Sequence, residues 1–245
     1  MGLSGRDKSK HLSRDLLPGV PVGSRWLAAR RISPQLAYRY VQSGWLERVA
    51  HGVFAKPGTP LEVDPSLRLL VELGHRVHVG GKTALAWHGH RHNLALSGEA
   101  LTLYGQGKRP LPDWFTARFH PQTTSRRLFD EESGQPLYVS DHPDHRGVPV
   151  SEPERAALEM LSEVPARQGV EEAGHLMEGL VTLRPAPLQD LLARCTNRKT
   201  VLLFHHFARA SNLSVLDRLA LDRLPAGSKS RYVLRLPRGT LALKP

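Results

Sequence analysis

Hydrophobic positions between residues 33 and 42 recur at helical spacing and give that segment two different faces. Ser33 is a favourable N-cap and Pro34 suits the first helical position, so a helix is expected to start there. Its apolar face contains Leu36, Ala37, Tyr40 and Val41. Its opposite face gathers hydrogen-bonding side chains: Gln35, Tyr38, Arg39 and Gln42. One face is therefore expected to pack, and the other to meet a partner.

A shorter amphipathic segment precedes this helix. Ser24 can cap a helix that carries Trp26 and Leu27. Ile32 then leads into the second helix. Arg31 stands in the turn between the two helices, where a glycine would adopt the required backbone more easily. The spacing of the two segments is typical of a helix-turn-helix.

The residues that follow predict a hairpin. Segments 45–49 and 53–55 alternate around a three-residue loop, 50–52, which contains a glycine able to adopt a positive φ. The hairpin carries three polar or basic groups: Arg48, His51 and Lys56. Helix, turn, helix and hairpin together predict a winged helix-turn-helix domain over residues 1–58.

A winged helix-turn-helix places its second helix in the major groove of double-stranded DNA. The side chains predicted to face operator DNA are Ser33, Gln35, Tyr38, Arg39, Gln42, Arg48, His51 and Lys56. The alternative is that an ordinary amphipathic helix pair with a hairpin produces the same pattern. Its Arg and Gln side chains would then be merely solvated.

The charge distribution favours DNA as the partner. The chain has a formal net charge of +11 and a pI of about 10.3, which suits a polyanion. Residues 1–58 contain ten Lys or Arg against three acidic residues, whereas the remainder contains 24 against 20. Attachment to a membrane surface would favour an uninterrupted basic amphipathic helix, and Pro18 and Gly19 break residues 1–20.

Residues 59–245 show the patterns of a larger mixed α+β domain whose second half is mostly helical. Helices are expected over 61–74 and 82–89, and strands over 77–79, 101–104, 116–120 and 137–140. Further helices are expected over 152–163, 169–181, 187–195, 198–209 and 213–222, followed by a strand over 231–236. Ser151 and Glu154 have the spacing of a capping box. The fold class predicted is thus α+β, with domains 1–58 and 59–245.

Residues 79–83, Val-Gly-Gly-Lys-Thr, follow a predicted strand and precede a predicted helix, as the end of a phosphate-binding loop does. The complete motif requires a glycine where this chain has Arg76. We therefore interpret the segment as a strand-to-helix turn with two glycines, with nucleotide binding as the alternative. No cofactor is expected.

Histidines are abundant in residues 75–92, where His88 and His92 have the i, i+4 spacing of metal ligands on a helix. Gly89 interrupts that helix, and no glutamate occupies the position that an HExxH site requires. Neither an Asp/Glu-x-Lys nuclease pattern nor a G-x-S-x-G elbow occurs in the chain. We expect no metal and no enzyme; the alternative is a nucleic-acid-processing metalloenzyme with its site in residues 75–145.

The single cysteine, Cys195, excludes an internal disulfide framework and suits a reducing cytosol. We interpret it as a small buried hydrophobe. The N-terminal residues lack the apolar stretch of a secretory signal, and no run of about 18 apolar residues predicts a membrane span. A cytoplasmic protein without membrane attachment is expected.

Several segments resemble AbiEi-type antitoxins, in the same order along the chain. The resemblance to the N-terminal domain of that family is carried by residues 16–19, 26–28, 43–48, 54–58 and 78–85. The resemblance to its C-terminal domain is carried by residues 150–159 and 177–185. Two residues depart from the family pattern: Arg31 stands at the usual glycine of the turn, and Phe54 where tyrosine is commoner.

This resemblance implies a bacterial repressor that autoregulates the operon of a type IV toxin–antitoxin, or abortive-infection, system. In that family the N-terminal winged domain represses the operon. The C-terminal domain is the antitoxin against a nucleotidyltransferase toxin, without requiring direct contact. One winged domain buries a modest interface, so inverted repeats bound cooperatively by two molecules are expected. An orphan regulator without a toxin, and an adaptor whose C-terminal helices chiefly bind protein, are the alternatives.

Overall fold

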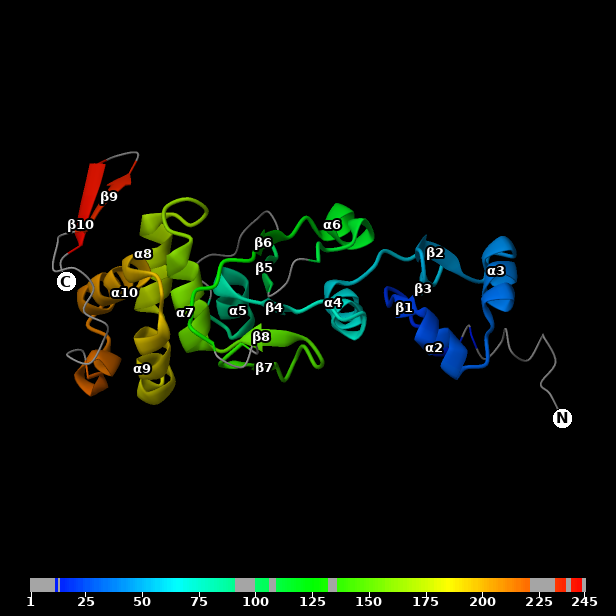
Figure 1. The fold of residues 1–245 in the computed structure, drawn as a ribbon, viewed down its shortest axis with the longest axis horizontal. Coiled ribbons are helices and arrows are strands. Elements are labelled where there is room, and N and C mark those ends of the chain that lie inside the picture. The colour runs from blue at the N-terminus through cyan, green and yellow to red at the C-terminus, as the bar shows by residue number, and fades with distance from the viewer. Residues whose placement is uncertain are drawn as a thin grey trace. The chain divides into compact units, whose positions relative to one another are not determined.

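The computed structural model describes residues 12, 14–90, 100–105, 109–131, 136–220, 232–236 and 239–243. The chain forms two compact units (Figure 1). Unit 1 comprises Met1–Arg76 and Gly107–His120, and unit 2 comprises Val77–Gln106 and Pro121–Pro245. Both units combine helices with strands, which confirms the mixed α+β class predicted from the sequence. The domain boundary after residue 58 stays a prediction.

Unit 1 begins with two helices and a small sheet. Helix α2 is Ser24–Ala29 and helix α3 is Pro34–Gln42. The sheet has the order β1-β3-β2, with β1 Val22–Gly23, β2 Glu47–Ala50 and β3 Val53–Ala55. Helix, turn, helix and hairpin therefore follow one another as the sequence predicts. Strand β1, which pairs antiparallel with β3, was not predicted.

The predicted N-cap of α2 is wrong. Gly23 occupies the N-cap position, and Ser24 is the first helical residue. The hydroxyl of Ser24 donates to the carbonyl of Gly52 at 3.4 Å, and its backbone N–H donates to the same carbonyl at 3.0 Å. Pairing of β1 with β3 thus ties the start of α2 to the hairpin turn instead of leaving the hydroxyl to cap the helix.

The core of this part of unit 1 joins both helices to the hairpin. Its buried side chains are Leu12, Leu16, Val22, Leu27, Ile32, Ala37, Tyr40 and Leu46. Trp26, Leu36, Val41 and Phe54 pack against them with partial burial. Because these residues lie on one face of each helix, the opposite face of each remains in solvent.

Two further helices belong to unit 1: α4, Val63–Glu72, and α6, Asp113–Phe119. The strand predicted over 116–120 is therefore wrong. Phe115 and Phe119 lie four residues apart, and their rings meet with centroids 4.9 Å apart, a contact that a helix makes and a strand does not. Trp114 and Phe115 are buried, so packing overrides the strand-like composition of the segment.

A five-stranded mixed sheet lies at the centre of unit 2, with the order β6-β5-β4-β8-β7. Its strands are β4 Val77–Val79, β5 Thr102–Gly105, β6 Gln122–Thr124, β7 Val139–Asp141 and β8 Pro149–Ser151. Strands β4 and β8 are parallel, as are β5 and β6, and the other neighbours are antiparallel. Helix α5, Gly81–Trp87, follows β4, and helix α7, Pro153–Ser162, follows β8.

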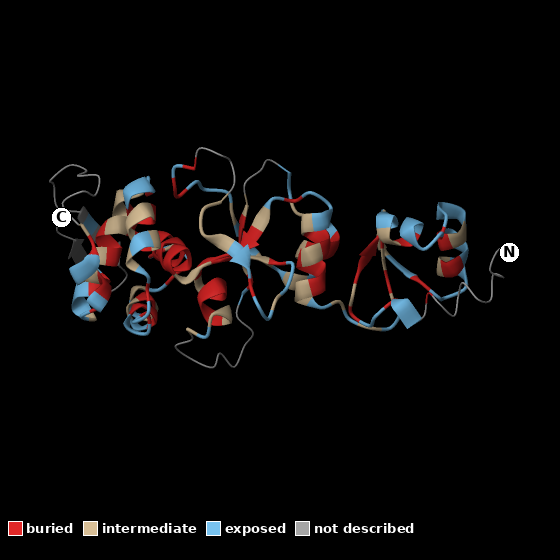
Figure 2. Ribbon diagram, turned by 90° about the horizontal axis from the view of Figure 1, so that it is seen from below, coloured by how far each residue is buried: buried red, intermediate tan, exposed pale blue. Residues whose placement is uncertain are grey.

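The second half of unit 2 is mostly helical, as predicted. Helices α8 Val170–Glu178, α9 Pro185–Arg194 and α10 Arg198–Ala210 pack around α7. Every residue of α7 from Glu154 to Ser162 is buried, and buried residues are red in Figure 2. No helix of the described residues is both long enough and apolar enough to span a bilayer.

Two predictions near the C-terminus need correction. Only a short 3-10 helix, Ser214–Arg218, forms within the segment 213–222 expected to be an α-helix. Strand β9, Tyr232–Leu236, is present as expected, and it pairs with a second strand that was not predicted, β10, Gly239–Leu243.

Five of the described helices end in the same turn: α2, α3, α4, α5 and α10. In each, the residue after the C-cap donates its N–H to the carbonyl three positions before it, and the next residue donates to the carbonyl five positions before it. This is the Schellman motif, in which the residue directly after the C-cap needs a positive φ. The residues at that position have φ between 48° and 86°: Arg31, Gly44, Gly74, Gly89 and Asn212. Glycine and asparagine suit the position, so Arg31 is the exception among the five.

Candidate functional site

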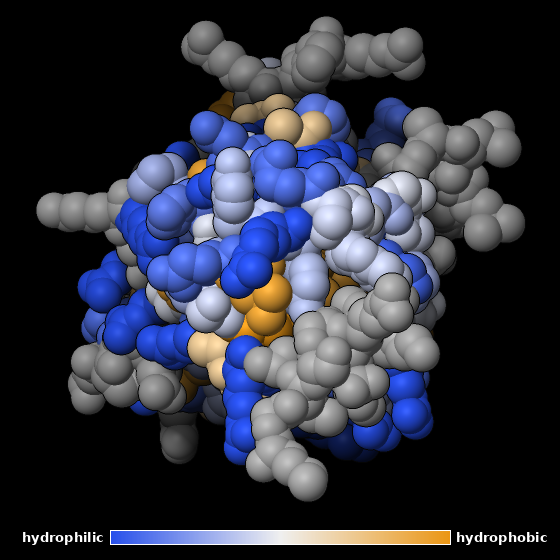
Figure 3. All heavy atoms as spheres, turned by 90° about the vertical axis from the view of Figure 1, so that its right-hand side faces the viewer, coloured by the Kyte–Doolittle hydropathy of each residue, from blue (hydrophilic) through white to orange (hydrophobic). Residues whose placement is uncertain are grey.

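The outer face of α3 presents polar side chains. Ala37 and Tyr40 are buried in the core of unit 1. Exposed side chains cover the opposite side: Gln35, Tyr38, Arg39 and Gln42. Tyr38 exposes 62% of its surface. Unit 1, viewed from the side that carries α3, is covered mainly by hydrophilic residues (Figure 3). The two faces predicted from the sequence are present, and the binding role of the outer one stays a prediction.

Ser33 fixes where this face begins. Its Oγ accepts a hydrogen bond from the backbone N–H of Leu36 at 3.3 Å, and Pro34 takes the first helical position. The bond satisfies one of the N–H groups that a helix leaves unpaired at its start. Ser33 is exposed, so the same residue lies at the surface of unit 1 where α3 starts.

The hairpin is tighter than the sequence predicts. Strand β2 runs to Ala50, so the turn consists of His51 and Gly52, with φ +73° at Gly52. A bulge between Arg48 and Ala50 accommodates the extra residue. Arg48 Nη2 lies 3.3 Å from Nδ1 of His51, and both side chains are exposed. Two of the three predicted hairpin residues are therefore neighbours at its tip.

Basic side chains of unit 1 carry charge that the protein does not neutralise. Within the described part of the chain, six of them form no side-chain hydrogen bond and no ion pair: Arg14, Arg25, Arg31, Arg39, Lys56 and Arg76. Arg30 differs, because it pairs with Asp15 at 3.0 Å and lies over the ring of Trp26.

Several basic side chains of unit 2 have acidic partners instead. Lys82 pairs with Glu172, and Arg194 pairs with Asp190. Two further arginines pair with buried carboxylates: Arg155 with Glu131 and Glu159, and Arg184 with Glu154. Four other described arginines of unit 2 form no side-chain hydrogen bond and no ion pair, so unpaired positive charge is not confined to unit 1: Arg126, Arg127, Arg209 and Arg218.

A fully buried carboxylate, that of Glu159 on α7, joins the sheet of unit 2 to two helices. It accepts hydrogen bonds from four donors: His78 Nε2 at 3.0 Å, Gly81 N–H at 3.0 Å, Ser151 Oγ at 2.8 Å and Arg155 Nε at 2.7 Å. Burial alone would raise the pKa of Glu159, but contacts with His78 and Arg155 outweigh it and lower the pKa. Arg155 and Glu159 lie four residues apart in an apolar helix, a sequence signal from which the pair could have been inferred.

This carboxylate explains the Val-Gly-Gly-Lys-Thr segment. The N–H of Gly81 binds Oε2 of Glu159, so an amide that a phosphate-binding loop would offer to its ligand serves the fold. A Cβ at Gly80 would lie 2.2 Å from Oε2 of Glu159 and 2.5 Å from Cδ2 of Tyr104. Gly80 is therefore required by the packing of the turn around Glu159, and glycine is favoured at position 81 by its φ of +53°.

The predicted capping box is wrong for the same reason. Glu152, rather than Ser151, is the N-cap of α7. The Ser151 hydroxyl donates to Glu159, and the Glu154 carboxylate accepts from the backbone and side chain of Arg184. Long-range partners thus take both side chains that the local pattern assigned to each other.

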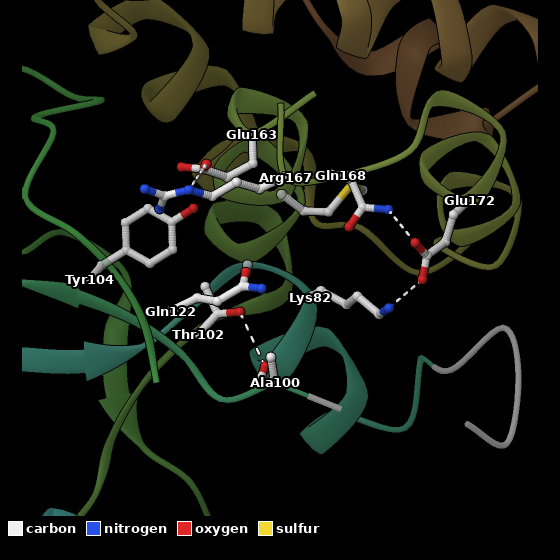
Figure 4. Close-up of a pocket in the computed structure, with 11 residues that line it drawn as sticks. Lys82, Ala100, Thr102, Tyr104, Gln122, Glu163, Arg167, Gln168 and Glu172 are labelled. Carbon is white, nitrogen blue, oxygen red and sulfur yellow. Dashed lines mark hydrogen bonds and ion pairs between the residues drawn. The ribbon is translucent and has the colours of Figure 1, made fainter. Parts of the chain in front are cut away.

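A small pocket of about 90 Å³ opens beside α5 in unit 2 (Figure 4). Lys82 points toward Glu172 on one side, and Gln168 donates to the same carboxylate at 2.9 Å. Arg167 lies 3.8 Å from Glu163 on another side. Sites for drug-sized ligands occupy about 300–1,000 Å³. The volume is small for a nucleotide, and the basic groups that a phosphate would need are already paired with carboxylates.

Two of the histidines that suggested a metal site, His78 and His88, have other partners. His78 binds Glu159, and Nε2 of His88 donates to the carbonyl of Ser151 at 3.0 Å. His75 is buried in unit 1, and His92 lies outside the described residues. Across the described ranges, no group of three or more His, Cys, Asp or Glu side chains has an arrangement that could hold a metal ion.

Cys195 is buried, and its backbone forms an isolated antiparallel β-bridge with Phe129. Burial raises the pKa of its thiol to about 11. The thiolate, which is the nucleophilic form, is therefore scarce at neutral pH.

Two family models together match nearly the entire chain. One, described as the N-terminal domain of transcriptional regulator AbiEi antitoxins, matches residues 5–96. The other, described as transcriptional regulator, AbiEi antitoxin, type IV toxin–antitoxin system, matches residues 98–241. No curated protein sequence matches the chain.

A solved structure supports the same fold. The crystal structure of the RV2827C protein from Mycobacterium tuberculosis is similar with a TM-score of 0.60 at 15% sequence identity. The match covers 96% of this chain and 90% of that one. The two family models, which extend over both units, show that the chain belongs to the AbiEi antitoxin family of transcriptional regulators of type IV toxin–antitoxin systems.

Proposed function

We propose that this antitoxin is a DNA-binding repressor of its own operon. Unit 1 would act as a winged helix-turn-helix, with α3 as the recognition helix and the β2–β3 hairpin as the wing. The observation that carries the proposal is the exposed polar face of α3 within a unit where several described basic side chains, Arg39 among them, form no ion pair. Such a surface suits the phosphates and base edges of duplex DNA.

The predicted residues divide into three roles in this mechanism. Residues on the outer face of α3 read bases and contact phosphates in the major groove: Gln35, Tyr38, Arg39 and Gln42. Ser33 fixes the start of the helix through its cap. Basic and polar groups of the wing contact the adjacent backbone or minor groove: Arg48, His51 and Lys56. A base contact contributes about 1–3 kcal/mol of discrimination, whereas a phosphate contact strengthens binding to every sequence.

Operator recognition would use two molecules. One winged domain buries a modest interface, so specificity requires a second copy on a repeated half-site. We therefore propose cooperative binding to inverted repeats, without a stable dimer in free solution. Repression and antitoxin activity together place the protein in the cytoplasm.

The antitoxin activity would reside in residues 59–245. Membership of the AbiEi family supports a nucleotidyltransferase toxin as the functional partner, which the antitoxin would counteract without forming a stable complex. The absence of an enzymatic role is part of this proposal, and the partners found for the histidines and for Gly81 support it.

The test for DNA binding is fluorescence anisotropy with duplex DNA from upstream of the operon. Three contacts of about 1 kcal/mol each predict that the variant Gln35→Ala, Tyr38→Ala, Arg39→Ala binds on the order of 100-fold more weakly. Unchanged affinity would overturn the proposal. The control replaces three exposed residues of unit 2 with alanine: Ser125, Arg126 and Arg127. It removes two positive charges instead of one, and its affinity should stay near that of the wild type.

The antitoxin role is tested by co-expression with the product of the neighbouring gene from an unrelated promoter. Wild-type protein and the triple α3 variant should both restore growth, because neutralisation is assigned outside α3. Failure of the wild type to restore growth would contradict the toxin–antitoxin pairing. Stable co-purification without DNA would favour the adaptor alternative instead.

A further inference from the structure

Arg31 occupies a backbone position that disfavours it. It is the positive-φ residue of the Schellman motif that ends α2, with φ +58°. The same motif ends α3 within unit 1, where the corresponding residue is Gly44 with φ +73°. An L-residue with a Cβ is strained in this conformation, whereas glycine is not. The motif also ends α4 of unit 1, with Gly74 at φ +83°, so unit 1 has a glycine at two of three equivalent turns and an arginine at the third.

No side-chain contact within the described part of the protein offsets this strain. Arg31 is exposed, and its side chain forms no hydrogen bond and no ion pair there. Its neighbour Arg30 provides the contrast, since that guanidinium binds Asp15 and stacks on Trp26 at 3.6 Å. The backbone bonds of the turn come from N–H groups that any residue except proline would supply. The side chain of Arg31 thus contributes nothing visible to the fold.

The location of Arg31 indicates what its side chain is for. It lies two residues before Ser33, the N-cap of α3. The N-terminal residues of a recognition helix are those that approach the bases, so this turn comes close to the DNA backbone in a bound complex. Strained residues gather where a surface is specialised for binding. A free guanidinium is well suited to a phosphate, to which it can donate two parallel hydrogen bonds.

We propose that Arg31 binds a DNA backbone phosphate beside the entry of α3 into the major groove, at the expense of fold stability. This inference rests on the proposed function of unit 1. It assigns to Arg31 a contact independent of base sequence, in addition to the contacts proposed for the outer face of α3. Arg31 in place of the usual glycine of the turn would then increase the affinity of the protein for DNA.

The test is the variant Arg31→Gly, examined in the full chain by two measurements. Relief of strain should raise its melting temperature by about 2–4 °C. Loss of one phosphate contact should reduce the slope of log affinity against log salt by about 0.9. If the variant and the wild type bind equally at 1 M salt, this difference in slope makes the variant bind about eightfold more weakly at 0.1 M salt. Opposite changes in stability and affinity in one variant would not arise from a merely structural role.

Two controls isolate the phosphate contact. Arg31→Lys keeps the charge and the Cβ, so it should retain the salt slope and show no rise in melting temperature. Asn212→Gly relieves the same backbone position at the end of α10 in unit 2, and should leave DNA affinity unchanged. A loss of affinity with Asn212→Gly as large as that with Arg31→Gly would overturn the assignment.

The outcomes separate this inference from the proposed function. If the wild type binds its operator and Arg31→Gly binds equally well with the same salt slope, Arg31 makes no phosphate contact and the inference fails alone. If Arg31→Gly weakens binding to the operator but not to unrelated duplexes, the contact is to a base and the assignment is wrong. If the wild type binds no duplex, the proposed function fails first.

Discussion

Replacement of Glu159 by glutamine removes one buried charge while keeping the size of the side chain. The carboxylate has no exposed surface and accepts four hydrogen bonds, two of them from His78 and Arg155. Glutamine keeps one acceptor oxygen and turns the other into an NH₂ group, which would face donors. Removal of one partner from a buried ion pair costs about 3–5 kcal/mol, because the other charge is left buried without compensation. We expect Glu159→Gln to destabilise unit 2 by about this amount.

This loss is measurable because it is a large fraction of the total stability of a typical domain, about 5–15 kcal/mol. Hydrogen exchange followed by mass spectrometry reports on unit 2 directly, and the amides of β4, α5 and β8 should exchange much faster in the variant. Glu172→Gln is the matched control. Its carboxylate is 40% exposed and pairs with Lys82, so its loss should cost at most about 1 kcal/mol.

The pH dependence gives an independent check of the same reasoning. The folded-state pKa of Glu159 lies below the ordinary value of 4.5. Its contribution to stability is therefore complete above pH 4.5 and is lost as the pH falls through the folded-state value. Glu159→Gln should unfold with a shallower dependence on acid pH than the wild type. Equal stability of the two proteins at pH 7, within about 1 kcal/mol, would refute the role given to this carboxylate.

Three other perturbations test the structure further. Gly80→Ala would place a Cβ 2.2 Å from Glu159 and should destabilise unit 2 by about 1–3 kcal/mol in urea unfolding. Gly179→Ala, whose nearest new contact is at 3.5 Å, should change stability by less than about 0.5 kcal/mol; similar losses in both variants would contradict the clash. Tyr40→Phe removes a buried hydroxyl that has no partner among the described residues, so stability should stay level or rise by about 1 kcal/mol. A loss of more than about 1 kcal/mol would show that the hydroxyl is bonded. Burial lowers the pKa of three histidines, so the unfolded chain binds more protons below their ordinary value of 6.5: His75, His88 and His205. Melting temperatures should therefore fall between pH 7.5 and 5.5, and a flat profile would contradict this reasoning.

Features encoded by neighbouring residues could be predicted from the sequence. Ser33 and Pro34 start α3 as expected, because capping and proline preferences act within one turn of helix. The two faces of α3 followed from its period, and the hairpin followed from alternation around Gly52. The apolar face of α3 packs into the core of unit 1, and its outer face is exposed for that reason. The helical period of the sequence was therefore enough to predict which side chains are exposed.

Features that depend on contacts between residues far apart in the chain could not be predicted from the sequence. Strand β1 is only two residues long, and pairing with β3 is what makes it a strand. Ser24 and Ser151 both have the pattern of helix caps, but their hydroxyls bind Gly52 and Glu159 instead. Helix α6 has the composition of a strand and is helical because its aromatic side chains are buried on one side. In each case tertiary contacts decided between local alternatives of similar energy.

The interleaving of the two units along the chain limits how this protein can be divided. Residues Val77–Gln106 belong to unit 2, yet they lie between the two stretches that build unit 1. A hybrid gene joined after residue 76 would leave α6 behind, with the buried rings of Trp114 and Phe115. A single recombination crossover therefore cannot transfer unit 1 intact to another regulator. New combinations of operator and toxin are expected to arise by substitution within a whole gene, and not by shuffling of its halves.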